Sequence, residues 1–193
     1  MNFNKFTIKS QEVVQKAIEI ARSNGNQAIE PLHLLKAVMS ESDSLMNFIL
    51  QKLGSSLQII DGAVGRELAS LPRVQGGEPY LSSKSNDVML KAESLAQANG
   101  DEYVSVEMIL LAIFAVQSPA STILKDAGVT EKDLKAAIDE LRKGSKANSQ
   151  SAEDQYNALS KYAINLCERA RSGKLDPVIG RDDEIRRVLQ ILS

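Results

Sequence analysis

The feature that most constrains this 193-residue chain is an internal duplication. When residues 6–38 are laid without gaps over residues 81–113, ten of the 33 aligned positions are identical, including Asn24 and Gly25 with their counterparts 75 positions later. After one single-residue gap the similarity continues to about residue 142. Two copies are too few for an open solenoid, so we expect two halves packed face to face.

The pattern within each copy is helical. Apolar residues recur at steps of three and four, as in Val13, Ala17 and Ala21, and aromatic residues make up only 4% of the chain. Thr7 and Ser82 are suited to cap the starts of two equivalent helices, and the Asn-Gly pairs are suited to end them. The sequence therefore predicts an all-α fold of two tandem pseudo-symmetric helical repeats, with further helices over 45–53, 57–71, 121–127 and 131–142.

Composition divides the chain into three parts. We expect a helical domain over residues 1–143, with repeat 1 at about 6–71 and repeat 2 at about 81–142. The stretch 144–155, GSKANSQSAEDQ, is polar and has no large apolar residue, so it predicts a flexible linker. Residues 156–193 resume a helical pattern that is broken near Pro177, which indicates the beginning of another domain.

Charge and cysteine content exclude several classes of partner. The net charge of -2 provides no broad attraction for nucleic acid or anionic lipid. No apolar run approaches the roughly 20 residues of a membrane-spanning helix. The lone Cys167 cannot form an intramolecular disulfide, and residues 1–9 do not resemble a secretory signal. We expect a cytoplasmic protein that binds neither nucleic acid nor membrane.

A catalytic function is disfavoured by the scarcity of reactive groups. His33 is the single histidine, and Glu30 three residues earlier would leave a metal underliganded. Gly173-Lys174 lacks the preceding glycine and the following Ser or Thr of a phosphate-binding loop. We predict no catalytic residues, no metal site and no enzymatic activity for this chain.

Two segments resemble a known family. The run 29–35, IEPLHLL, within a duplicated helical unit resembles the Clp N-terminal domain, which ClpA- and ClpC-type proteins share. The runs 152–155, 158–162 and 173–187 resemble the entrance to the first AAA+ domain of the ClpB family of protein disaggregases. Together these resemblances cover essentially the whole chain and favour the ClpB family.

The resemblance implies a substrate-recruiting domain that binds unfolded or aggregated polypeptides for a homohexameric ATPase acting with the DnaK system. Its polar substrate contacts would fall on Thr7, Asp101 and Glu107, with Leu95 and Met108 as apolar positions in a groove between the repeats. Alternatives remain open: Thr7 also suits a helix cap, and Leu95 also lies on the core stripe.

In the full-length protein the resemblance implies ATP and magnesium as cofactors, with Val178, Ile179, Gly180 and Arg181 lining the adenine pocket. The chain itself is expected to hold no cofactor. Two rival functions remain: an adaptor-docking N-domain of a ClpC- or ClpA-type protease regulator, and a spacer that regulates the ATPase ring.

Overall fold

The computed structural model describes residues 3–41, 43–52, 56–74, 77–156, 166–171, 173 and 180–192. The chain divides into two compact units, Met1–Tyr156 and Asn157–Ser193. The second unit contains the helices α11 (Leu166–Arg171) and α12 (Asp182–Leu192), which lie on either side of the break that the sequence predicts near Pro177. The side chain of Cys167 lies outside the described residues.

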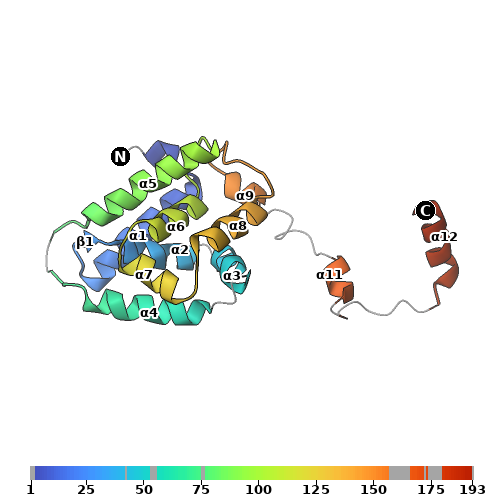
Figure 1. Cartoon of the computed structure of the whole chain (residues 1–193), viewed down its shortest axis with the longest axis horizontal. Coiled ribbons are helices and arrows are strands. Elements are labelled where there is room, and N and C mark those ends of the chain that lie inside the picture. Colours follow the sequence, from blue (N-terminus) through green and yellow to red (C-terminus); the bar gives the residue numbers. More distant parts are fainter. Residues whose placement is uncertain are drawn as a thin grey trace. The chain divides into compact units, whose positions relative to one another are not determined.

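The first unit contains the two repeats, and the all-α fold is confirmed (Figure 1). Among the described residues, each repeat contains four α-helices in the same order. Repeat 1 contains η1 (Phe3–Lys5), α1 (Ile8–Asn24), β1 (Ala28–Ile29), α2 (Pro31–Glu41), α3 (Asp43–Lys52) and α4 (Leu57–Ser70). Repeat 2 contains β2 (Tyr80–Leu81), α5 (Ser83–Asn99), α6 (Val106–Ala115), α7 (Pro119–Asp126) and α8 (Glu131–Arg142), and is followed by α9 (Ala152–Tyr156).

The predicted caps set the ends of α1 and α5. The Thr7 hydroxyl accepts a hydrogen bond from the amide of Ser10, and Ser82 does the same at the start of α5. Gly25 and Gly100 end the two helices with φ of 72° and 76°. In this left-handed region a side chain would be strained, which explains the repeated glycine.

The two repeats interlock through short backbone pairings. β1 pairs with β2 in parallel, which aligns Ile29 with Leu81. An isolated parallel bridge joins Phe6 to Val104. A shift of 75 residues converts one pairing into the other, so each repeat begins beside the entry to the partner repeat's second helix. The expected face-to-face packing therefore has approximate two-fold symmetry.

The core is built around α2 and α6, which contact each other and are enclosed by the remaining helices of the unit (Figure 1). Every residue from Val106 to Phe114 in α6 is buried. A helix that is apolar on nearly all sides requires such a central position. Among the described residues no single helix is long and apolar enough to span a membrane; one bent pair, α6 with α7, passes by length and composition alone.

The stretch 144–155, which the sequence predicts as a flexible linker, is instead packed within the first unit. Ala147 and Ala152 are buried, and the first compact unit continues to Tyr156 instead of ending at residue 143. The amides of Glu102 and Tyr103 both donate to the Ala147 carbonyl, at 3.1 and 3.0 Å. Small side chains allow the backbone to approach closely, so main-chain hydrogen bonds replace the large apolar anchors that the prediction required.

Candidate functional site

A buried arginine organises the polar side chains at one end of the first unit. Arg142, the last residue of α8, is 3% exposed. Its Nε donates to Glu107 Oε1 at 2.7 Å, and its Nη1 donates to Asp101 Oδ2 at 2.7 Å. The Nη2 group donates to Ser105 Oγ at 2.6 Å. Charge-assisted bonds of this kind compensate the burial of a guanidinium.

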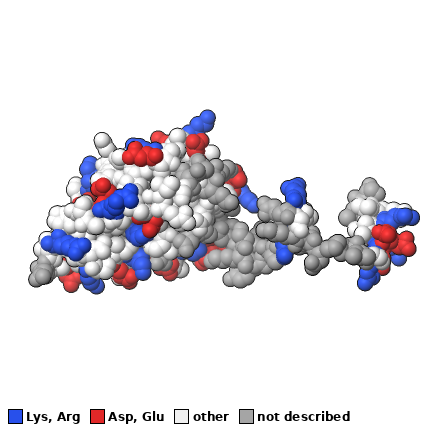
Figure 2. Space-filling view, turned by 90° about the horizontal axis from the view of Figure 1, so that it is seen from below, with Lys and Arg blue, Asp and Glu red and all other residues white. Residues whose placement is uncertain are grey.

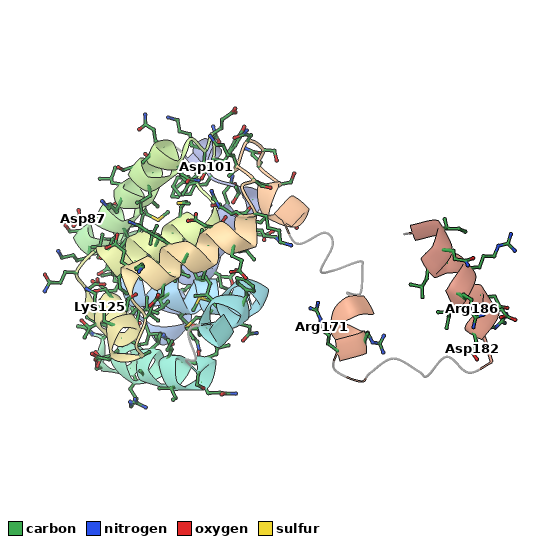
Figure 3. The ribbon with its side chains drawn as sticks, turned by 45° about the vertical axis from the view of Figure 1, so that its right-hand side comes forward. Asp87, Asp101, Lys125, Arg171, Asp182 and Arg186 are labelled. Carbon is green, nitrogen blue, oxygen red and sulfur yellow. The ribbon has the colours of Figure 1, made fainter. Side chains whose placement is uncertain are left out.

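The electrostatics agree with this geometry. Burial alone would lower the pKa of Arg142, but the nearby carboxylates of Glu107 and Asp101 outweigh that effect and raise the pKa above its ordinary value. Figure 3 labels Asp101, which follows the glycine that ends α5. Its second oxygen, Oδ1, accepts from the amide of Ala147 at 3.0 Å. Arg142 and Ala147 therefore hold Asp101 from two segments.

A second polar group lies beside the first. The Thr7 hydroxyl donates to Glu153 Oε1 at 2.6 Å, and the amide of Val106 donates to the same oxygen at 3.1 Å. The other oxygen, Oε2, is buried without a hydrogen-bond partner among the described residues. Burial, followed by the nearby charge of Glu107, raises the pKa of Glu153, although the bonds from Thr7 and Val106 oppose the shift.

The equivalent place in repeat 1 is built around a neutral histidine. His33 Nδ1 accepts from the amide of Glu30 at 2.9 Å, so its proton resides on Nε2, which donates to Asn26 Oδ1 at 3.1 Å. Burial lowers the pKa of His33 to about 4. The histidine is a structural residue here, and no group of three potential metal ligands occurs within the described ranges.

The structure brings three of the predicted contact residues together. Thr7, Asp101 and Glu107 come from separate segments, yet Arg142 and Glu153 join their side chains into one neighbourhood. All three are buried rather than open to solvent: Thr7 and the Asp101 side chain are 0% exposed, and Glu107 is 1% exposed. Their predicted contact with substrate stays a prediction.

The two predicted apolar contact residues, Met108 and Leu95, differ in how exposed their side chains are. Met108 is 4% exposed and belongs to the core, so it does not line an open groove in this structure. The reason is that α6 is buried on every side, including the side that carries Met108. Leu95, on α5, is half-buried and packs against the core. Of the two, Leu95 alone keeps a partly accessible side chain.

The predicted nucleotide residues belong to the second unit. Val178 and Ile179 lie outside the described residues. Gly180 has a φ of 73°, and Arg181 Nη1 forms an exposed ion pair with Glu184 Oε1 at 3.0 Å. Residues 1–193 contain no phosphate-binding loop, so these residues do not form a complete nucleotide site.

Sequence reasoning missed Arg142, Ser105 and Glu153 as members of the site. Ser105 precedes α6, but its side chain makes no cap bond; the hydroxyl instead accepts from Arg142. Glu153 takes over that role by accepting from the amide of Val106.

One signal in the sequence could have identified this cluster. Three neutral residues of repeat 1 are replaced by charged residues at the equivalent positions of repeat 2: Asn26 by Asp101, Leu32 by Glu107 and Leu68 by Arg142. A cation and two anions that appear together in one copy indicate a buried ion cluster.

Comparison with known proteins covers the whole chain. Over all 193 residues it is 62% identical to chaperone protein ClpB of Bacteroides thetaiotaomicron and 60% identical to that of Porphyromonas gingivalis. The chain spans 22% of the length of each of these relatives.

Solved structures show the same fold. The Hsp104 N-terminal domain from Candida albicans matches with a TM-score of 0.70 and 27% identity, covering 77% of this chain and 99% of that one. The N-terminal domain of the caseinolytic protease associated chaperone ClpD from Arabidopsis thaliana, at 21% identity, matches in fold with a TM-score of 0.56, covering 71% of this chain and 94% of that one. The model of the Clp repeat (R) N-terminal domain matches residues 5–127. The duplicated helical unit and these matches together show that the chain belongs to the Clp repeat N-terminal domain family.

Proposed function

We propose that this chaperone N-domain recruits unfolded or aggregated polypeptide segments for an ATP-dependent disaggregase. The observation that carries the proposal is the convergence of Thr7, Asp101 and Glu107 in one polar cluster, although the three residues come from separate segments. A polypeptide in extended form offers amides and carbonyls along its length. Carboxylates and a hydroxyl gathered at one place are suitable partners for them.

Accessible apolar side chains on the first unit support the same function. Ile8, directly after Thr7, is 50% exposed, and Leu90 on α5 is 61% exposed. On the face shown in Figure 2, basic and acidic side chains are interspersed with uncharged ones over the described surface. Such a surface suits weak binding to many sequences, and we expect dissociation constants in the micromolar to millimolar range.

The full-length protein would supply the remaining parts of the activity. We place the chain in front of an AAA+ ring that assembles as a homohexamer, binds ATP with magnesium and acts with the DnaK system in the cytoplasm. The support is the 62% identity with a ClpB chaperone that extends through residues 157–193. Recruitment, rather than hydrolysis, is the part of this activity that residues 1–156 would perform.

A titration tests the proposal. The labelled chain is titrated with a permanently unfolded, reduced and carboxymethylated protein, and amide shifts are followed by NMR. Thr7→Ala should weaken binding several-fold, whereas Ser82→Ala should not. Ser82 is a matched control, since it caps α5 as Thr7 caps α1 and donates to the Glu30 carboxylate at 2.9 Å. Equal effects of the two changes would reduce the role of Thr7 to helix capping.

The rival functions predict different results in the same assay. An adaptor-docking domain would bind a folded adaptor and show no preference for unfolded chains. A spacer would bind neither, and its deletion from the full-length protein would alter ATPase activity alone. Absence of saturable binding by the folded wild-type chain would contradict recruitment.

A further inference from the structure

Residues 144–156, which we call the strap, lie on the residues proposed to hold polypeptide. The Ala147 amide donates to Asp101 Oδ1 at 3.0 Å. Further along, the carbonyl of Gln150 accepts from the amide of Ile8 at 2.8 Å, one residue after Thr7. The Glu153 carboxylate then accepts from Thr7 itself. The strap thus contacts Asp101 and, at the start of α1, both Thr7 and Ile8.

The strap is bound in the way that a peptide ligand is bound. Among its described residues, the contacts are mainly backbone hydrogen bonds to the loop after α5 and to the start of α1, together with two small buried side chains, Ala147 and Ala152, and one buried carboxylate, Glu153. An exposed ion pair between Lys9 and Asp154, at 2.9 Å, adds little. Backbone amides and carbonyls, small residues and an acidic residue can be supplied by many unfolded sequences.

The strap is also bound imperfectly. The Oε2 atom of Glu153 is buried without a partner, and the charge of Glu107 lies near enough to disfavour a second negative charge. A buried polar atom without a hydrogen bond carries a free-energy cost. Ser151, two residues earlier, is exposed. The strap can therefore leave without breaking a large apolar interface.

We propose that the strap is an intramolecular occupant of the polypeptide site, which an unfolded segment must displace, and that the site prefers segments carrying a small residue and an acidic residue in the places of Ala147 and Glu153. This inference rests on the proposed function and adds to it a substrate class and a form of autoinhibition. Only molecules whose strap has left the site bind polypeptide. The measured dissociation constant therefore equals the intrinsic dissociation constant divided by the fraction of molecules in that state.

Direct observation of the strap provides the first test. Unfolded polypeptide is titrated into the wild-type chain while the amide signals of Glu102, Tyr103 and Ile8, whose acceptors are strap carbonyls, are followed. We expect those amides to lose hydrogen-exchange protection and the signals of residues 149–151 to move to random-coil positions. Saturable binding that leaves these signals unchanged would overturn the inference while supporting the proposed function.

Variants provide the second test. Ala147→Glu places a charged side chain in a fully buried position and should release the strap without altering Thr7, Asp101 or Glu107, so polypeptide should bind about tenfold more tightly. Ser151→Glu is the matched control at an exposed strap position and should leave affinity unchanged. If Ala147→Glu loses protection at Glu102 but gains no affinity, the strap does not compete. If no variant and no wild-type chain binds polypeptide, the proposed function itself fails.

A competition assay tests the preferred sequence. A synthetic peptide of residues 144–156 should displace unfolded polypeptide from the Ala147→Glu chain, and its Glu153→Lys version should compete at least tenfold less well. Equal competition by the two peptides would contradict the acidic preference.

Discussion

The two repeats build the same corner of the fold with different chemistry. Beside the second helix of repeat 1, the hydroxyl of Ser82 from repeat 2 donates to Glu30 of repeat 1, and the neighbouring Asn26 pairs with His33. Beside the second helix of repeat 2, the hydroxyl of Thr7 from repeat 1 donates to Glu153, which belongs to the strap. The first corner is closed by the two repeats themselves, whereas the second is closed by a separate segment that can leave. The asymmetry distinguishes the corner beside the second helix of repeat 2, where we propose that polypeptide binds.

Breaking the ion cluster should have the largest effect. Arg142→Leu leaves Asp101 and Glu107 buried without their cation and should lower the free energy of unfolding by about 3–5 kcal/mol. Leucine is the residue that repeat 1 carries at the equivalent position, Leu68. Urea denaturation of the purified chain measures the loss.

The matching control converts the cluster to the repeat 1 pattern. Combining Arg142→Leu with Asp101→Asn and Glu107→Leu removes both stranded charges and should recover stability to within about 1–2 kcal/mol of the wild type. A triple variant no more stable than the single one would show that the two corners are not interchangeable.

His33 should make repeat 1 sensitive to acid. Its pKa is about 4 in the folded chain and ordinarily 6.5, so the unfolded chain binds more protons between these values. The contribution is fully present above pH 6.5 and is lost as pH falls towards 4, by about 3 kcal/mol. Urea denaturation at several pH values measures this slope, which His33→Gln should remove. An NMR titration of His33 with a midpoint near 6.5 would contradict the prediction.

The two caps should differ in a smaller effect. Ser82→Ala removes a cap and should cost about 1 kcal/mol. Thr7→Ala should cost about 1 kcal/mol more, because it also removes a donor from the buried Glu153 carboxylate. In a double-mutant cycle, thermal unfolding of Thr7→Ala, Glu153→Ala and the double variant should reveal coupling between the two residues. Additive effects would mean that the 2.6 Å bond contributes nothing to stability.

Neutralising Glu153 should have the smallest effect. In Glu153→Gln the amide oxygen can still accept from Thr7 and Val106, so stability at neutral pH should change by less than about 1 kcal/mol, towards greater stability. The raised pKa means that the wild type loses stability as pH rises above the ordinary value of 4.5, and the Gln variant should not. The difference between the two chains in urea denaturation should therefore grow with pH; a constant difference would argue against a penalised charge.

Much of the fold could be predicted because its signals are local. Thr7, Ser82, Gly25 and Gly100 act within one helical turn, so their capping roles follow from residue type and spacing. The duplication similarly indicates two equivalent halves before any contact is known. The candidate site was predicted less completely: the resemblance supplied Thr7, Asp101 and Glu107, but not the arginine that joins two of them.

By itself, the sequence determined which segments of the two repeats are helical, the ends of α1 and α5, and the pseudo-symmetry, because apolar periodicity and capping depend on neighbours a few residues apart. Only the tertiary structure decided the position of the strap and the burial of Arg142 and Met108. Contacts between Ala147 and Asp101, or between Glu153 and Thr7, join residues 46 and 146 positions apart. Such contacts depend on backbone approach and on competition among several possible partners, and a polar stretch of small residues carries no local signal of either.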